Sequence, residues 1–204
     1  MRLSLLLALL ALPALAAVPE KGEGTITVLP GARFIPGNGP YLDEQGGSHR
    51  VVQPGVIGSF GYQYDDELHF KIDLGYLLDS YSNGLEVRTI PILIGMDTAL
   101  LRRSWCTVYG GGGIGYSLNT GNRNGTHQEA NSTAGFLQLG WRIALASKVA
   151  LVIEDRYTLA SGQVDFPTST QSLNVGGNFF SIGLMVHFLE PDDKGHPQAP
   201  PEMH

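Results

Sequence analysis

The chain has 204 residues, with 13 Lys and Arg against 19 Asp and Glu, 27 Gly and a single Cys. Its formal net charge of −6 argues against nucleic-acid binding, and a single Cys excludes an internal disulfide framework and a Cys-rich zinc site. A mean hydropathy near zero excludes a polytopic helical membrane protein and argues against wholesale disorder. The length fits one domain, or a small domain with a tail.

The first residues have the pattern of a secretory signal. Arg2 gives a positive start, Leu3 to Leu12 is almost wholly Leu and Ala, and Pro13 ends this run. Ala14-Leu15-Ala16 then has the small-x-small pattern of a signal-peptidase site. We therefore expect residues 1–16 to be a cleaved signal peptide. An uncleaved membrane anchor is the alternative, although the apolar run is short for a membrane span.

After the signal, the sequence predicts β-strands. Apolar residues recur at every second position, most clearly from Phe180 to Phe188, and Gly, Asn, Asp and Ser mark the breaks. The eight predicted strands are 24–34, 54–64, 68–78, 86–101, 106–118, 132–145, 149–159 and 175–188.

The predicted connections alternate in length. The short ones are 65–67, 102–105 and 146–148, and the mostly longer ones are 35–53, 79–85, 119–131 and 160–174. Short turns at one end and long loops at the other are typical of an up-and-down membrane barrel.

The composition of the two strand faces decides between a soluble and a membrane barrel. One face is large, apolar and aromatic, whereas the other carries Gly, Ser, Thr, Gln and a few charges. Such strands fit an apolar face against lipid and a polar face toward a narrow lumen. The sequence therefore predicts an all-β fold, an eight-stranded antiparallel up-and-down transmembrane β-barrel with short periplasmic turns and longer external loops. Aromatic residues near the strand ends predict two interfacial belts, one with Tyr62, Tyr64, Trp105 and Phe188 and one with Tyr76, Tyr81 and Tyr116.

Three short motifs connect the chain to a known family. They are Ser181-Ile182-Gly183-Leu184-Met185-Val186-His187-Phe188, Glu154-Asp155-Arg156-Tyr157, and Ile90-Pro91-Ile92-Leu93-Ile94-Gly95. With these motifs the mature chain resembles the eight-stranded outer-membrane barrels of the OmpA/OmpX type.

The resemblance implies a place and partners for the protein. It implies the bacterial outer membrane, contact with outer-membrane lipids and lipopolysaccharide, and recognition of the last strand by the barrel-assembly machinery. The residues that match this assembly signal are Ser181, Gly183, Val186 and Phe188. We expect a barrel over residues 17–189 and a disordered periplasmic tail over 190–204, which is rich in Pro and charge.

Some residues depart from the barrel pattern. Pro30 and Pro91 fall within predicted strands, where we expect bulges or local breaks because proline lacks an N–H donor. Asp155 falls on the face assigned to lipid, where a carboxylate is costly unless a bulge or the nearby headgroups accommodate it.

The polar face of the predicted strands carries charges of both signs. They are Arg33, Lys71, Arg142 and Arg156, which face Asp73, Asp97 and Glu154. Eight strands leave room only for side chains, and buried charges must pair to offset desolvation. We expect a structural network that plugs the lumen. A gated ion path or a proton-coupled site is the alternative.

No motif in the sequence predicts a catalytic, cofactor or metal site. We therefore expect a non-enzymatic barrel with an envelope-structural or surface-binding role, which would bind a surface ligand through loops 35–53, 119–131 and 160–174. A lipid A-modifying enzyme is a second hypothesis, with Ser48 and His49 or His127 and Ser132 as the reacting pair. A small pore or transport accessory is a third hypothesis, and a soluble lipid-binding barrel is a fourth.

Overall fold

The computed structural model describes residue 19 and residues 21–34, 52–80, 85–123, 126–166, 169–174 and 176–188. They form the strands β1 (Gly24–Phe34), β2 (Val52–Gln63), β3 (Leu68–Ser80), β4 (Leu85–Arg103), β5 (Cys106–Arg123), β6 (Thr126–Ala146), β7 (Val149–Phe166), β8 (Ser169–Asn174) and β9 (Gly177–Phe188). The predicted signal peptide and the predicted tail lie outside the described residues. Among the described residues, no helix is long and apolar enough to cross a membrane.

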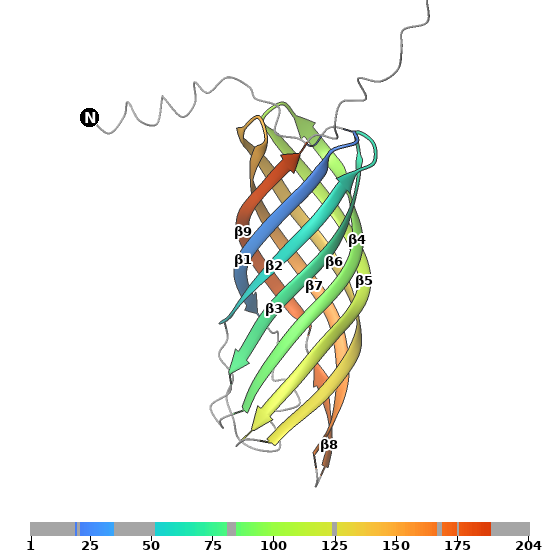
Figure 1. The fold of residues 1–204 in the computed structure, drawn as a ribbon, viewed down its shortest axis with the longest axis vertical. Coiled ribbons are helices and arrows are strands. Elements are labelled where there is room, and N and C mark those ends of the chain that lie inside the picture. The colour runs from blue at the N-terminus through green and yellow to red at the C-terminus, as the bar shows by residue number, and fades with distance from the viewer. Residues whose placement is uncertain are drawn as a thin grey trace, which may run out of the picture.

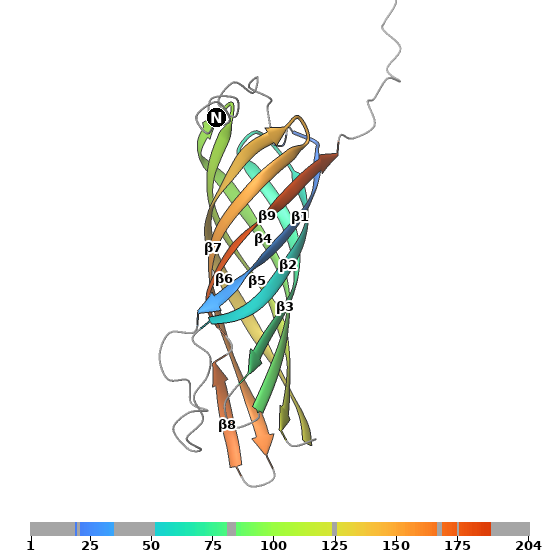
Figure 2. The same cartoon turned by 90° about the vertical axis from the view of Figure 1, so that its left-hand side faces the viewer.

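Eight of the strands close into a barrel, which confirms the predicted fold class. Each strand from β1 to β7 pairs with the next in antiparallel fashion, β7 pairs with β9, and β9 returns to β1. Figures 1 and 2 show the tilted strands wrapping around one axis. The ninth strand, β8, pairs with β7 beyond the closed wall.

The strand register fixes the geometry of the barrel. A circuit that passes from each residue to its partner on the next strand starts at Gly24 and returns to β1 at Phe34. The residues on this circuit are Gly24, Tyr62, Phe70, Met96, Gly112, Leu137, Tyr157, Asn178 and Phe34. The difference between positions 34 and 24 is a stagger of ten residues. This shear tilts the strands strongly and keeps the lumen narrow enough for side chains to fill.

Most of the large apolar side chains point outward, and a smaller apolar cluster that includes Leu29, Ile57, Phe179 and Met185 is buried inside the barrel. Leu137 is 68% exposed and Ile114 is 75% exposed, whereas the charged and polar side chains of the other strand face are buried. This arrangement confirms the assignment of the two faces and excludes the soluble barrel with an apolar cavity. Of the aromatic residues predicted to form belts, all that are described are exposed on the outer wall, and Tyr81 lies outside the described residues.

The two prolines interrupt the strand pairing without shifting it. The β1–β9 ladder skips from Val28 to Gly31 around Pro30, and the β3–β4 ladder skips from Ile92 to Thr89 around Pro91, each in an unchanged register. The expected local breaks are therefore present, but the expected bulges at the prolines are wrong. Register shifts occur instead between Ala99 and Leu101 and between Ala144 and Ala146, beside short turns.

Two segments predicted as loops are mostly strand. β5 and β6 run through 119–131 apart from residues 124–125, and β7 and β8 occupy most of 160–174. The alternation of apolar and polar residues does not reveal these strands, because most residues on both of their faces are polar in the sequence. The third predicted loop, 35–53, lies outside the described residues up to position 51, and β2 begins at Val52.

The extended strands form two ribbons that project past the closed wall. β6 and β7 pair only up to Ala134 and Ala160. Beyond this point β6 stays with β5, which remains paired with β4 as far as Leu85 and Arg123, and β7 stays with β8. β8 pairs with β7 in the same register as β9, which occupies the same edge of β7 within the closed wall. Gly177, at the start of β9, has a left-handed φ of 139°. The β7–β8 ribbon projects at the bottom of Figure 2.

Candidate functional site: the charged network inside the barrel

The structure places all seven predicted lumen charges inside the barrel. Each of these side chains is at most about 5% exposed. Six of them come together in one cluster, namely Lys71, Asp73, Asp97, Arg142, Glu154 and Arg156. Because strand side chains alternate between faces, β3, β4, β6 and β7 all send these residues to the same side of the wall. The seventh, Arg33, belongs to a separate pair.

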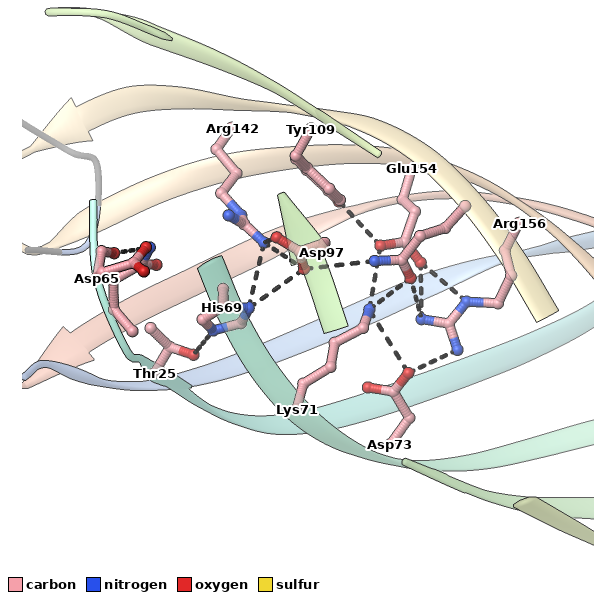
Figure 3. Close-up of polar contacts among 12 residues, drawn as sticks. Thr25, Asp65, His69, Lys71, Asp73, Asp97, Tyr109, Arg142, Glu154 and Arg156 are labelled. Carbon is pink, nitrogen blue, oxygen red and sulfur yellow. Dashed lines mark hydrogen bonds and ion pairs between the residues drawn. The ribbon is translucent and has the colours of Figure 1, made fainter. Parts of the chain in front are cut away.

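One end of the cluster is built around Asp97. Arg142 Nη2 donates to Asp97 Oδ1 at 2.7 Å and to Oδ2 at 2.8 Å. His69 Nδ1 lies 3.2 Å from Oδ2 of the same carboxylate, and its Nε2 lies 2.9 Å from Thr25 Oγ1 (Figure 3). Charge-assisted contacts of this kind compensate the loss of hydration that a buried carboxylate suffers.

The other end is built around Glu154. Arg156 donates to Glu154 Oε1 from Nε at 3.0 Å and from Nη2 at 2.8 Å. Tyr109 donates its hydroxyl to Oε2 at 2.8 Å, and Lys71 Nζ lies 3.5 Å from the same oxygen. Arg156 Nη1 also lies 2.8 Å from Asp73 (Figure 3).

Gln138 joins the two ends. Its Oε1 accepts from Lys71 Nζ at 2.6 Å and from Arg156 Nη2 at 3.3 Å, while its Nε2 donates to Asp97 at 3.4 Å. Three cations and three carboxylates thus share one hydrogen-bonded unit with no formal net charge. A buried network of this kind is stable only when its members satisfy one another.

Two glycines make the crossings between strands possible. Tyr109 on β5 reaches Glu154 on β7 by passing over Gly140 on the intervening β6, where an added Cβ would lie 2.5 Å from the Tyr109 ring and hydroxyl. His69 likewise covers Gly61, where a Cβ would lie 2.3 Å from Nε2. The glycines that weaken an ordinary strand therefore provide space for the network.

Aromatic rings cover the faces of the cations. The guanidinium of Arg142 lies 4.0 Å from the ring centroid of Tyr109, and that of Arg156 lies 4.5 Å from the centroid of Phe136. Lys71 Nζ lies 5.7 Å from the same Phe136 ring. These cation–π contacts stabilise charge where water is largely excluded.

Arg33 pairs with a residue that the strand pattern assigns to a loop. Its Nη2 contacts Asp79 Oδ2, and both side chains are 2% exposed. The pattern misses Asp79 because it ends the strand at residue 78, whereas β3 continues to Ser80. His69 and Gln138 lie on the polar strand face and are predictable members of the network, but the crossing of Tyr109 over Gly140 has no sequence signature.

Two small cavities lie beside the network in the described part of the barrel. A cavity of about 20 Å³ lies between Arg33, Arg156, Thr89 and apolar side chains, and one of about 10 Å³ lies between His69, Lys71 and Glu154. Each holds about one water molecule at most. In the described part of the chain, no group of three His, Cys, Asp or Glu side chains is arranged to hold a metal ion.

The predicted assembly signal lies on β9, at the strand that closes the barrel against β1. Ser181 and Gly183 lie in the lumen-facing register, and Ser181 Oγ donates to the Glu154 carbonyl oxygen at 3.3 Å. Val186 and Phe188 face outward, 46% and 40% exposed.

The predicted catalytic pairs do not form a site in the described residues. His127 is exposed on the outer face of β6 and Ser132 is buried on its inner face, so the two side chains point to opposite sides of the wall. Ser48 and His49 lie outside the described residues.

Outside the membrane-spanning strands, the turn between β2 and β3 is organised by Asp65. Its Oδ1 accepts from the backbone N–H groups of Glu67 at 2.8 Å and Leu68 at 2.7 Å. These two bonds favour the ionised form and lower the pKa of Asp65 below that of an ordinary aspartate.

The strand order and the polar lumen agree with a comparison against protein families. The family described as "Outer membrane protein beta-barrel domain" matches residues 3–188. The chain belongs to this family. It is an outer-membrane β-barrel protein. A comparison with curated proteins found no match.

Solved structures show the same fold at low sequence identity. OprG from Pseudomonas aeruginosa has a TM-score of 0.67 and 12% identity, covering 84% of this chain and 98% of its own. Neisserial surface protein A has a TM-score of 0.60 and 17% identity, covering 82% and 98%. Ail, the attachment invasion locus protein of Yersinia pestis, has a TM-score of 0.52 and 10% identity, covering 82% and 99%. These likenesses concern the fold.

Proposed function

We propose that this protein is a non-enzymatic, non-conducting barrel of the outer membrane that supports the envelope or binds at the cell surface. The proposal that the lumen is closed rests on the charge cluster around Gln138, which connects side chains from β3, β4, β6 and β7. Because each carboxylate in it is held by cations, moving an ion through would require several buried charge pairs to separate.

The surface-binding part of the proposal rests on the two projecting ribbons. β5–β6 and β7–β8 extend past the closed wall and replace the loops that we expected at 119–131 and 160–174. The outward side chains of β4 and β6 there include the exposed Glu86, Arg88, His127 and Glu129. One protein of similar fold, Ail, has been solved in complex with the heparin analogue sucrose octasulfate, which makes sulfated glycans a sensible first probe.

The conductance of reconstituted protein tests the closed lumen. We expect the wild-type protein to give no stable channels in planar bilayers. Glu154→Ala should also give no large conductance, because Arg156, Lys71 and Gln138 still fill the lumen. Steady ohmic channels in the wild-type protein would contradict the proposal and favour the small pore or transport accessory.

Lipid A analysis tests the non-enzymatic assignment. Mass spectrometry should show identical lipid A acylation in a deletion strain and in the same strain carrying the restored gene. A change in acylation that depends on His127 or His49 would contradict the assignment.

The processing of the chain completes the proposal. We infer cleavage after Ala16, export to the outer membrane, and recognition of β9 by the barrel-assembly machinery through its outward Val186 and Phe188. N-terminal sequencing of the membrane-inserted protein should begin at Ala17. Truncation before Phe188 should reduce insertion far more than truncation after it.

A further inference from the structure

Asp155 is a carboxylate on the outside of the barrel. It is exposed on β7, its register partners are Leu139 on β6 and Phe180 on β9, and Ile153 and Tyr157 are the neighbouring outward residues on its own strand. The strand has no register shift at this position, so the bulge that could have turned the side chain inward is absent. Asp155 therefore faces the lipid from within an apolar wall.

This carboxylate has no partner among the described residues of the protein. No hydrogen bond or ion pair from those residues reaches it, in contrast to the adjacent Glu154, which contacts Arg156, Tyr109 and Lys71. An ionised group on the lipid face is destabilising in proportion to its depth. Donors that compensate this cost must come from something that packs against the outer wall.

The position of Asp155 along β7 determines its neighbours on the outer wall. Moving along β7 away from the short turn after Ala146, the outward residues are Leu151, Ile153, Asp155, Tyr157 and Leu159. Tyr157 is 44% exposed and pairs in register with Asn178 at the start of β9. Asp155, Tyr157 and Asn178 are thus neighbours in the register on the outer wall, and Tyr157 and Asn178 lie on the side of Asp155 toward the ribbons.

A second copy of the chain is a poor partner for this patch. A twofold contact centred on Asp155 would bring two carboxylates together in a medium of low dielectric constant. The exposed Arg88 forms an ion pair with Glu86 at one end of β4. Arg102, at the other end of β4, forms an ion pair with Asp66 beside a short turn. These two cations, and the exposed Arg103 and Lys148, lie toward strand ends, whereas Asp155 lies well inside β7.

We propose that Asp155, with Tyr157 and Asn178, binds the headgroup of an outer-leaflet lipid that donates N–H or O–H groups. The carboxylate accepts from the headgroup, and the Asn178 amide and Tyr157 hydroxyl offer further donors and acceptors. The apolar side chains of Leu139 and Phe180 flank the carboxylate, where they contact the acyl chains. The patch is a lipid site on the outer wall, independent of the lumen and of the ribbons.

The test compares the wild-type protein with Asp155→Leu and Asp155→Asn in vesicles that differ only in headgroup. Phosphatidylcholine has a cation without a donor, phosphatidylethanolamine adds N–H donors, and phosphatidylglycerol supplies O–H donors. In phosphatidylcholine, Asp155→Leu should be more stable to urea than the wild-type protein. In a lipid with donors, the difference between the unfolding equilibrium constants of the two proteins should shrink by about tenfold. The lipid in which it shrinks identifies the kind of donor.

Ile94→Asp is the matched control, because Ile94 is 64% exposed on the outer face of β4, away from Tyr157 and Asn178. Its stability deficit should depend much less on the headgroup than that of Asp155. An Asp155→Leu gap that is equal in all three lipids would overturn the proposal. A headgroup response of Ile94→Asp equal to that of Asp155 would overturn it as well, because the site would then be no more than a carboxylate in lipid.

Discussion

Glu154 and Asp155 are consecutive carboxylates on β7 that face opposite sides of the same wall. Glu154 is 1% exposed and is held by Arg156, Tyr109 and Lys71. Asp155 is exposed between Leu139 and Phe180 and receives no such contact from the described residues. The comparison shows that the barrel pairs the buried carboxylate with its own side chains, whereas the described residues give the outward carboxylate no partner.

The largest effect should come from removing the inner carboxylate. Glu154→Ala leaves Arg156 and Lys71 buried with fewer partners, so we expect the free energy of unfolding to fall by about 3–5 kcal/mol. Urea titration in vesicles measures this loss. Asp155→Ala is the control on the same strand, and it should not destabilise the barrel. Equal losses for the two variants would show that a carboxylate contributes equally to stability on the two faces of the wall, which would contradict this prediction.

Filling the space above Gly140 tests whether the barrel needs a glycine where Tyr109 crosses β6. Gly140→Ala places a methyl group where the Tyr109 ring lies, so the variant should lose about 1–3 kcal/mol of stability. Gly135, on the outer face of the same strand, has only a backbone oxygen at 3.8 Å from an added Cβ. Gly135→Ala should therefore be close to neutral, and a comparable loss there would indicate a general effect of strand glycines.

The Tyr109 hydroxyl should make a smaller contribution. Tyr109→Phe keeps the ring under Arg142 and removes one donor to Glu154, so we expect a loss of about 1.5 kcal/mol. The loss should disappear when Tyr109→Phe is made in a Glu154→Ala background. If it persisted there, the hydroxyl would be acting through another partner.

The smallest effect concerns a charge in water. Because the pKa of Asp65 is lower in the folded protein than in the unfolded chain, its contribution to stability is present above about pH 4 and is lost as the pH falls through the folded pKa. The stability difference between the wild-type protein and Asp65→Ala should therefore be small at pH 7 and should shrink in acid. A difference that grows in acid would contradict this reading of the turn.

The sequence predicts most of the barrel because lipid imposes a strict alternation on the spanning residues. The predicted bounds of β1 match the observed ones, and both ends of β9 are close. The alternation gives no information where both faces meet water, and for this reason the predicted β5 and β6 are too short and β8 is missed.

The members of the inner network are predictable to a lesser degree than the strands. The period of two is enough to place Lys71, Arg142 and Glu154 on the lumen face. The period does not show which residues meet across the lumen, because those contacts depend on the stagger of the closed sheet. Asp79 and the crossing of Tyr109 over Gly140 become visible only with the register.

A double-mutant cycle on Asp97 and Arg142 tests most directly whether the lumen charges stabilise one another. Arg142 Nη2 lies 2.7 and 2.8 Å from the two oxygens of Asp97, at the centre of one end of the network. Asp97→Asn, Arg142→Gln and the double variant would be unfolded by urea in the same vesicles. The account predicts a coupling free energy of about 2 kcal/mol or more. Additive losses would contradict it, since the two charges would then be buried without depending on each other.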